Sequence, residues 1–207
     1  MFMLKPLPDL VNDFDLDIRG AIHIGGHHGQ EYVYYKNLGL TNIIFVEPQP
    51  NCFSVLSENV GDECLLFNVA LGNFTGKADM FTEEANQGQS SSLLTPHKHV
   101  TQYPNIVFNG KIKVDITKLD LLPFDRSLYN FINIDVQGYE LEVFRGGTDT
   151  LKNIDYIYTE VNRAELYFGC ARVERLDDFL GEYGFIRVDT WWDGVTWGDA
   201  LYIRSDL

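Results

Sequence analysis

Short apolar runs alternate with amphipathic stretches along most of the chain. Apolar runs predict strands at 21–24, 43–47, 63–68, 129–134, 155–160, 185–190 and 200–203. Amphipathic stretches predict helices at 30–38, 51–59, 139–144 and 172–183. Strands that alternate with helices are typical of parallel sheets joined by right-handed crossovers, so we expect an α/β fold.

Two segments depart from this alternation. Residues 1–19 are a polar lead-in, with a short helix expected through 7–14 against the sheet edge. Strands are predicted at 77–82 and 111–116, and the stretch between them at 83–103 reads as a long loop. Loops longer than about 12 to 15 residues are usually functional or disordered. We interpret 83–103 as a lid or acceptor-binding loop of a single domain spanning 1–207.

Glycines follow the first predicted strand, in the order Gly25-Gly26-His27-His28-Gly29, and Glu47-Pro48 ends the second. A glycine loop lets the backbone approach a ligand closely, and an acid about 20 residues later commonly accepts hydrogen bonds from ribose hydroxyls. This spacing predicts nucleoside recognition. The three tryptophans, Trp191, Trp192 and Trp197, are expected in a turn between the last two strands.

A second junction runs from Asn133 through Asp135, Gln137 and Gly138 to Glu140, where a buried strand is predicted to turn into a helix. Ligands of open α/β sheets bind in the crevice outside the carboxyl ends of the strands, so the two acids are candidates for chemistry. The alternative is that Asp135 only caps the helix and Glu140 only favours its first-turn dipole.

The composition limits the binding partners and the cellular compartment that we expect for the protein. The formal charge of −14 argues against nucleic acid, whose affinity comes largely from Lys and Arg contacts. Cys52, Cys64 and Cys170 form an odd set without Cys-x-x-Cys spacing, which favours a reduced compartment. The start lacks the pattern of a signal peptide or a membrane span, so we expect a cytoplasmic protein with no membrane partner. The oligomeric state stays open.

Together these segments resemble the FkbM family of S-adenosylmethionine-dependent methyltransferases, from about Ala21 to Ile203. The resemblance rests on Ile24 to Gln30 with Phe45 to Pro48, on Asn68 to Gly72, and on Ile134 to Val143 with Arg145-Gly146-Gly147. It implies a Rossmann-like methyltransferase fold, with a mostly parallel seven-stranded sheet, helices on both faces and a C-terminal antiparallel hairpin. It also implies O-methylation of a sugar, glycan or small-molecule hydroxyl, with S-adenosylhomocysteine as product.

The resemblance assigns residues to the site. Cofactor contacts are expected from Gly25, Gly26, His28, Gly29, Glu47, Pro48, Asn68, Ala70, Leu71, Asp135, Gln137 and Glu140. Asp135 is the first choice for the base that removes the acceptor proton, and Glu160, at the end of the adjacent strand, is the second. Substrate contacts are expected from Ser91, Ser92 and Asn162. The family often has Asp at the position of His23 and Lys at that of Asn133, and these two departures leave the base and the substrate subclass open.

Two other classes compete. Tyr32 and Lys36 have the spacing of the proton-donating pair of some nicotinamide-dependent oxidoreductases, although helical aromatics at this spacing are more typical of core packing. A non-catalytic nucleoside-binding module is the third hypothesis. The five histidines lack zinc-site spacing, so we expect no metal site. A Mg²⁺ ion on Asp135 and Glu160 is an alternative that we do not favour.

Overall fold

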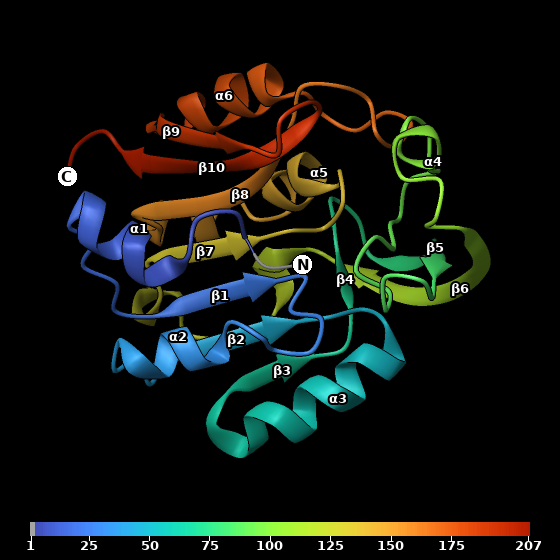
Figure 1. The fold of residues 1–207 in the computed structure, drawn as a ribbon. Helices are drawn as coiled ribbons and strands as arrows, with labels where there is room; N and C mark the ends of the chain where they lie inside the picture. The colour runs from blue at the N-terminus through green and yellow to red at the C-terminus, as the bar shows by residue number, and fades with distance from the viewer. Residues whose placement is uncertain (1–2) are drawn as a thin grey trace.

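The computed structural model describes residues 3–207, and its largest feature is a seven-stranded sheet (Figure 1). The strand order is β3-β2-β1-β7-β8-β10-β9. These strands are β1 (Ala21–Ile24), β2 (Ile43–Val46), β3 (Leu65–Phe67), β7 (Phe131–Ile134), β8 (Tyr156–Asn162), β9 (Phe185–Trp192) and β10 (Trp197–Arg204). The first five are parallel to one another, whereas β10 is antiparallel to both β8 and β9. The expected mostly parallel sheet with a C-terminal antiparallel hairpin is confirmed.

Helices cover both faces of this sheet. One face carries α1 (Leu7–Phe14), α2 (Tyr32–Asn37) and α3 (Pro50–Val60), and the other carries α5 (Glu140–Arg145) and α6 (Val173–Glu182). Successive side chains of a strand point to opposite faces. Ala21 therefore packs in the core of the first face, and its neighbour Ile22 in that of the second. Coverage on both sides explains the continuous apolar runs that predicted these strands.

Local signals set the helix ends close to the predicted positions. Pro50 occupies the first turn of α3, where its missing N–H costs no hydrogen bond. Gly61 follows the helix with φ of 58° and ends it. Short 3₁₀ turns complete the chain at Gly61–Glu63, Leu119–Leu121, Arg126–Leu128 and Thr150–Asn153.

A second, three-stranded sheet has the order β4-β6-β5. It comprises β4 (Ala70–Leu71), β5 (Gly76–Glu83) and β6 (Phe108–Thr117), so the strands predicted at 77–82 and 111–116 are longer than expected and stand apart from the main sheet. Figure 1 shows the arrowheads of β1, β2 and β7 pointing toward the side on which this sheet lies. The small sheet therefore stands beyond the carboxyl edge of the large one.

The segment 83–103 was predicted as a long loop, but part of it is regular structure. It contains the short helix α4 (His99–Gln102) and two isolated bridges, Phe81 with Ser92 and Pro96 with Tyr167. The Glu83 carboxylate also accepts hydrogen bonds from the backbone N–H groups of residues 86 and 90, at 2.6 and 3.2 Å. The Glu83 bonds are local to the segment, whereas the bridge from Pro96 to Tyr167, which no local pattern encodes, holds the segment against the body of the protein.

The predicted tryptophan turn is wrong. Trp191 and Trp192 end β9 and Trp197 begins β10, so that only residues 193–196 connect the strands. Aromatic side chains favour strands because they pack well on a pleated surface. Trp191 packs edge-on against Phe14 and Tyr158, with ring centroids 6.1 and 5.9 Å apart.

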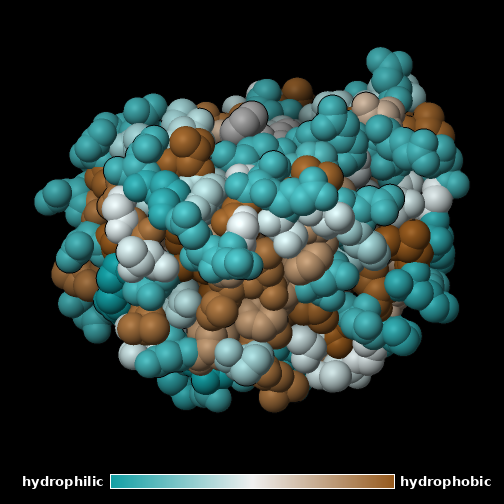
Figure 2. Space-filling model, turned by 90° about the horizontal axis from the view of Figure 1, so that it is seen from below, coloured by the Kyte–Doolittle hydropathy of each residue, from teal (hydrophilic) through white to brown (hydrophobic). Residues whose placement is uncertain are grey.

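The surface and the cysteines complete the description. Figure 2 views the side on which α3 and β3 lie, where hydrophobic residues gather in the middle of a largely hydrophilic face. Leu65 of the edge strand β3 is an exposed hydrophobic residue. Cys52, Cys64 and Cys170 are free thiols. Among residues 3–207, no helix combines the length and the apolar character needed to cross a membrane.

Candidate active site

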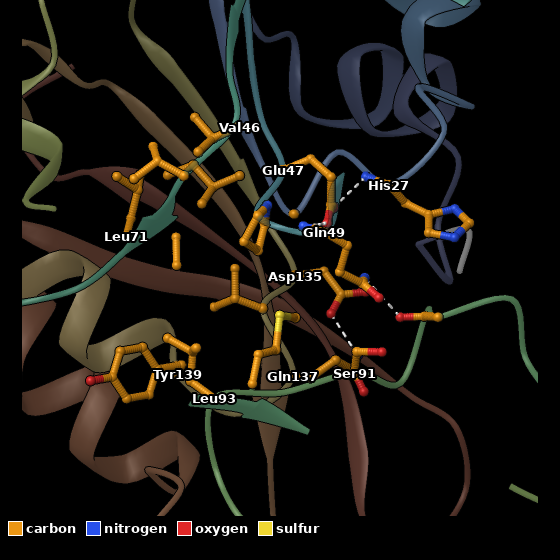
Figure 3. A pocket seen from close by; sticks show the side chains of 18 of the residues that line it. His27, Val46, Glu47, Gln49, Leu71, Ser91, Leu93, Asp135, Gln137 and Tyr139 are labelled. Atoms are coloured by element: carbon orange, nitrogen blue, oxygen red, sulfur yellow. Dashed lines mark hydrogen bonds between the residues drawn. The ribbon is translucent and has the colours of Figure 1, made fainter. Parts of the chain in front are cut away.

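A cavity of about 610 Å³, mouth included, opens at the carboxyl ends of β1, β2 and β7 (Figure 3). Seven of the twelve residues expected to contact a cofactor line it, namely Gly25, Glu47, Pro48, Ala70, Leu71, Asp135 and Gln137. Ser91, expected to contact substrate, lines it too. Figure 3 shows His27, Glu47, Gln49 and Ser91 toward one side and Leu71 and Tyr139 toward the other. The cavity is thus polar at one end and apolar at the other.

Glu47, at the end of β2, is the buried acid of this cavity. One carboxylate oxygen accepts the His27 N–H at 2.9 Å, and the other accepts the Gln49 N–H at 2.8 Å. Burial raises the pKa of Glu47 to about 7. Asn68 does not line the cavity, because its amide donates instead to the Glu47 carbonyl at 2.8 Å. Asn68 therefore positions the end of β2.

Gly25 forms the floor of the cavity, where β1 and β7 end side by side. Its φ is +86°, and a Cβ there would lie 1.9 Å from the Asp135 carbonyl oxygen. The backbone N–H of Asp135 also donates to the Ile24 carbonyl at 3.0 Å. Only glycine allows this close approach, because any side chain would separate the two strand ends.

The other residues predicted as cofactor contacts in the glycine loop pack against the protein and not against the cavity. A Cβ on Gly26 would lie 2.7 Å from the Phe45 ring, and one on Gly29 would lie 2.8 Å from Leu56. The His28 ring stacks on that of His27, with centroids 3.7 Å apart. Gly26, His28 and Gly29 do not line the cavity, so their predicted cofactor contacts would require a ligand to reach beyond it.

Gln137 links the two acids expected to do chemistry. Its side-chain N–H₂ donates to Asp135 Oδ1 at 2.7 Å and to Glu160 Oε2 at 2.8 Å. Its φ of +55° is uncommon for a residue other than glycine and marks local strain. Asp135 is partly buried, whereas Glu160 is fully buried. Burial, and after it the Asp135 charge, raises the pKa of Glu160 well above its ordinary value.

Glu140 organises its own loop and does not line the cavity. Its Oε1 accepts the backbone N–H groups of Val136 at 3.1 Å and Gly138 at 3.0 Å. Burial, followed by the nearby Asp135 charge, raises the pKa of Glu140 to about 7. Carboxylate oxygens of Asp135, Glu140 and Glu160 lie within 4.8 Å of one another. A Mg²⁺ ion at this cluster stays an alternative prediction.

Two of the predicted substrate residues also act within the protein. The Ser92 hydroxyl donates to the Gln137 carbonyl at 2.8 Å and accepts the Leu94 N–H at 3.0 Å. The Asn162 amide donates to Glu160 Oε1 at 3.2 Å. Both side chains are buried outside the cavity, where they hold residues that flank it.

His27 lines the cavity although the prediction passed over it. Its Nε2–H donates to the Gln87 carbonyl at 2.8 Å, which leaves Nδ1 to accept from the Gln30 amide, also at 2.8 Å. Burial lowers its pKa. Potential ligand atoms of His27, His28 and Cys52 lie within 4.8 Å of one another. Because both His27 ring nitrogens are engaged, this cluster suits a hydrogen-bonded loop better than a metal.

The prediction missed ten residues that line the cavity, some adjacent in sequence to predicted ones and others from more distant segments. These residues are Ile24, Val46, Gln49, Val69, Met80, Gly88, Gln89, Leu93, Val136 and Tyr139. Gln49 is typical: its amide donates to the Gly88 carbonyl at 3.1 Å, which ties the end of β2 to the segment 83–103. The only local signal was the position of Gln49 two residues after Glu47.

The two departures from the family pattern face each other in the core. His23 of β1 and Asn133 of β7 are register partners on the face covered by α1, α2 and α3. The Tyr35 hydroxyl lies 2.9 Å from His23 Nδ1 and accepts the Asn133 amide at 3.0 Å. Burial lowers the pKa of His23 to about 3, so the ring is neutral. A neutral network therefore fills this part of the core, away from the cavity.

Tyr32 and Lys36 do not form a catalytic pair. Both side chains contact Glu63 at the surface, and neither lines the cavity. This placement removes the sequence feature that favoured a nicotinamide-dependent oxidoreductase.

The strand order and the cavity at the carboxyl edge define a Rossmann-like methyltransferase fold. A Streptococcus pneumoniae protein suggested to be a tRNA methyltransferase, solved in complex with S-adenosyl-L-methionine, matches with a TM-score of 0.55 and 12% identity over 98% of this chain and 73% of that one. Magnesium protoporphyrin IX methyltransferase from Synechocystis, with bound S-adenosylhomocysteine, matches with a TM-score of 0.53 and 10% identity over 95% and 78%.

The chain belongs to the methyltransferase FkbM domain family, whose model matches residues 23–187. The expected family and fold class are confirmed. The 2-O-methyltransferase NoeI of Sinorhizobium fredii is 31% identical over 149 residues, which cover 68% of this chain. The chain spans 61% of the length of that curated relative.

Proposed function

We propose that the chain is an S-adenosylmethionine-dependent O-methyltransferase that acts on a hydroxyl of a small molecule, sugar or glycan. The observation that carries this proposal is the single cavity that brings together Glu47, at the end of β2, and Asp135, at the end of β7. Membership of the FkbM methyltransferase family and the name of its O-methyltransferase relative support it.

The residues of the cavity fit the cofactor. Glu47 offers remaining oxygen lone pairs to ribose hydroxyls, and Val69 and Leu71 supply an apolar wall for adenine. Asp135 and the neighbouring acids favour a cation. When bound, S-adenosylmethionine supplies an electrophilic methyl group on a positively charged sulfur.

Two carboxyl groups divide the proton chemistry. Burial, and after it the Asp135 charge, raises the pKa of Glu160 well above its ordinary value, which favours its protonated form. Asp135, which faces the cavity and is held by Gln137, would accept the proton of the acceptor hydroxyl while its oxygen takes the methyl group and the methyl–sulfur bond breaks, with S-adenosylhomocysteine as the leaving group. The cavity walls exclude water and align the reactants, and such alignment supplies about 7 to 11 kcal/mol in favourable cases.

Calorimetry tests cofactor binding. S-adenosylhomocysteine titrated into the wild type should bind, and Glu47→Ala should weaken that binding by about 100-fold, because two hydrogen-bonded ribose hydroxyls lose their acceptor. Glu58→Ala, at an exposed position of α3, is the matched control. A folded wild-type protein that binds neither S-adenosylmethionine nor S-adenosylhomocysteine would overturn the proposal.

Methyl-transfer rates then distinguish Asp135 from Glu160 as the catalytic base. With tritiated cofactor and a panel of methyl glycosides and simple alcohols, Asp135→Asn should retain S-adenosylhomocysteine affinity and lose about 10² to 10⁴ in transfer rate. Glu160→Gln mimics the protonated carboxyl that the raised pKa of Glu160 favours, so its rate should stay within about 3-fold of the wild type. The reverse pattern would assign the base to Glu160.

A further inference from the structure

A second cavity adjoins the first and shares Gln137 with it. It encloses about 430 Å³, mouth included, between the segment 83–103 and the start of β10. The residues that matter for its chemistry are His99, Tyr103, Ile106, Gln137, Glu160 and Trp197. Because Gln137 lies in the walls of both cavities, a molecule in the second would end next to one in the first.

The second cavity is built from well-anchored parts. The His97 and His99 N–H groups donate to the Leu166 carbonyl at 2.8 and 3.1 Å. The Trp197 indole donates to the Tyr103 hydroxyl at 2.8 Å, which ties the end of α4 to β10. These bonds exist without any ligand, so the cavity is preformed.

His99 leaves one buried nitrogen without a partner. Its ring packs between Tyr103, Phe108 and Tyr167, with centroids 5.0 to 5.4 Å away. Among the described residues, Nδ1 makes no hydrogen bond although the side chain is only 3% exposed. An unpaired buried polar atom costs about 1 to 3 kcal/mol. Nδ1 is too deeply buried for a cavity ligand to reach, so a ligand hydroxyl would contact the His99 ring at Nε2.

The lining also defines the charge of the occupant. None of the residues that line the cavity is Lys or Arg, and the one charged type among them is the Glu160 carboxyl. An anionic ligand would lack a counterion here and would meet the acids around Asp135. Tyr103 and Trp197 provide aromatic surface, and Gln137, Glu160 and His99 provide polar atoms. This combination suits an uncharged ring that carries several hydroxyls.

We infer that the second cavity is the acceptor site and takes an uncharged, polyhydroxylated ring such as a neutral sugar. The ring lies on Tyr103 and Trp197, and one of its hydroxyls reaches His99. The hydroxyl to be methylated sits at the Gln137 end, where it faces Asp135. This inference rests on the proposed function and adds the acceptor's place, size and charge to it.

Ligand-observed NMR on protein saturated with S-adenosylhomocysteine tests the charge preference. The probes are methyl glycosides of glucose, galactose and mannose, and the corresponding uronides, which add one carboxylate to the same ring. At least one neutral glycoside should bind, and its uronide should bind about 10-fold more weakly or worse. The inference fails if S-adenosylhomocysteine binds but no neutral glycoside does, or if the uronides bind equally well. Failure of S-adenosylhomocysteine itself to bind would instead refute the proposed function.

A filled cavity tests the location. Ile106→Phe adds volume at a partly exposed lining position, and should weaken glycoside binding by about 10-fold or more with S-adenosylhomocysteine affinity unchanged. Val107→Phe is the matched control, since Val107 is 60% exposed and lies outside the cavity. Equal glycoside affinities in the two variants would place the acceptor elsewhere.

His99→Phe separates a ligand contact from a structural role. It keeps the aromatic packing and removes a nitrogen that has no partner in the protein, so the melting temperature should stay equal or rise. Glycoside affinity should fall by about 5-fold or more, the loss expected for one hydrogen bond. A lower melting temperature with unchanged glycoside affinity would show that His99 serves only the fold.

Discussion

Asp199 should make the protein less stable as pH rises, and Asp199→Asn should abolish that effect. Asp199 lies in β10, directly across from Glu160 of β8, and is 1% exposed. Its Oδ2 accepts the Leu4 N–H at 2.5 Å. Burial first, and the Asp135 charge after it, raise the pKa of Asp199 from 3.8 to about 8.

The sign and size follow from proton linkage. Between the two pKa values the unfolded chain has lost the proton and the folded chain still holds it, so the free energy of unfolding falls with rising pH. One proton corresponds to about 1.4 kcal/mol per pH unit. From about pH 5 to about pH 7 the wild type should therefore lose about 2.7 kcal/mol relative to Asp199→Asn. The variant keeps a carbonyl oxygen that can accept from Leu4.

Urea unfolding at constant ionic strength, at each pH unit from about pH 5 to about pH 8, measures this difference. Glu31, Glu47 and Glu140, whose pKa values burial also raises to about 7, titrate in both proteins and largely cancel. Exposed Asp62→Asn is the control and should run parallel to the wild type. A stability gap between wild type and Asp199→Asn that stays constant with pH would refute the reasoning, whatever its size.

Two further predictions concern the strands that hold the site. Gly25→Ala should abolish S-adenosylhomocysteine binding in calorimetry, because its Cβ would displace the Asp135 backbone. Gly39 has φ of +76° but open space around it. Gly39→Ala should therefore lower the free energy of unfolding by only about 1 to 2 kcal/mol and leave binding intact. His23→Asp and Asn133→Lys should each lower the free energy of unfolding by about 3 to 5 kcal/mol, because each alone leaves a buried charge unpaired. The double variant should lose much less than the sum, and a strictly additive result in urea unfolding would show that the two positions do not pair.

Local periodicity was enough to predict most of the elements. Strands β1, β2 and β7 are buried on both faces, and Pro50 and Gly61 mark the ends of α3, so the sequence carries these boundaries itself. Glu47 and Asp135 could be predicted to share a site for a topological reason: neighbouring parallel strands place their carboxyl ends at one edge.

The remaining residues of the site depend on contacts that sequence spacing hides. Gly88 and Leu93 line the cavity because the segment 83–103 folds back on the end of β2, some 40 positions away. Asn68 and Glu140 have the polar character of ligand contacts, but their side chains form hydrogen bonds with nearby buried backbone groups instead. The same residue types serve both purposes, so residue identity alone does not separate them.

The buried acids connect stability with binding. Glu47, Glu140, Glu160 and Asp199 all have raised pKa values, so each ionised form is costly in the folded protein. Such a cluster weakens the free protein at neutral pH, yet it surrounds the cavities in which we place a cationic cofactor and an uncharged acceptor. A positive charge in the first cavity would offset part of the repulsion, and an anion in the second would add to it. In our proposal, the arrangement that costs stability is therefore the one that would select both reactants by charge.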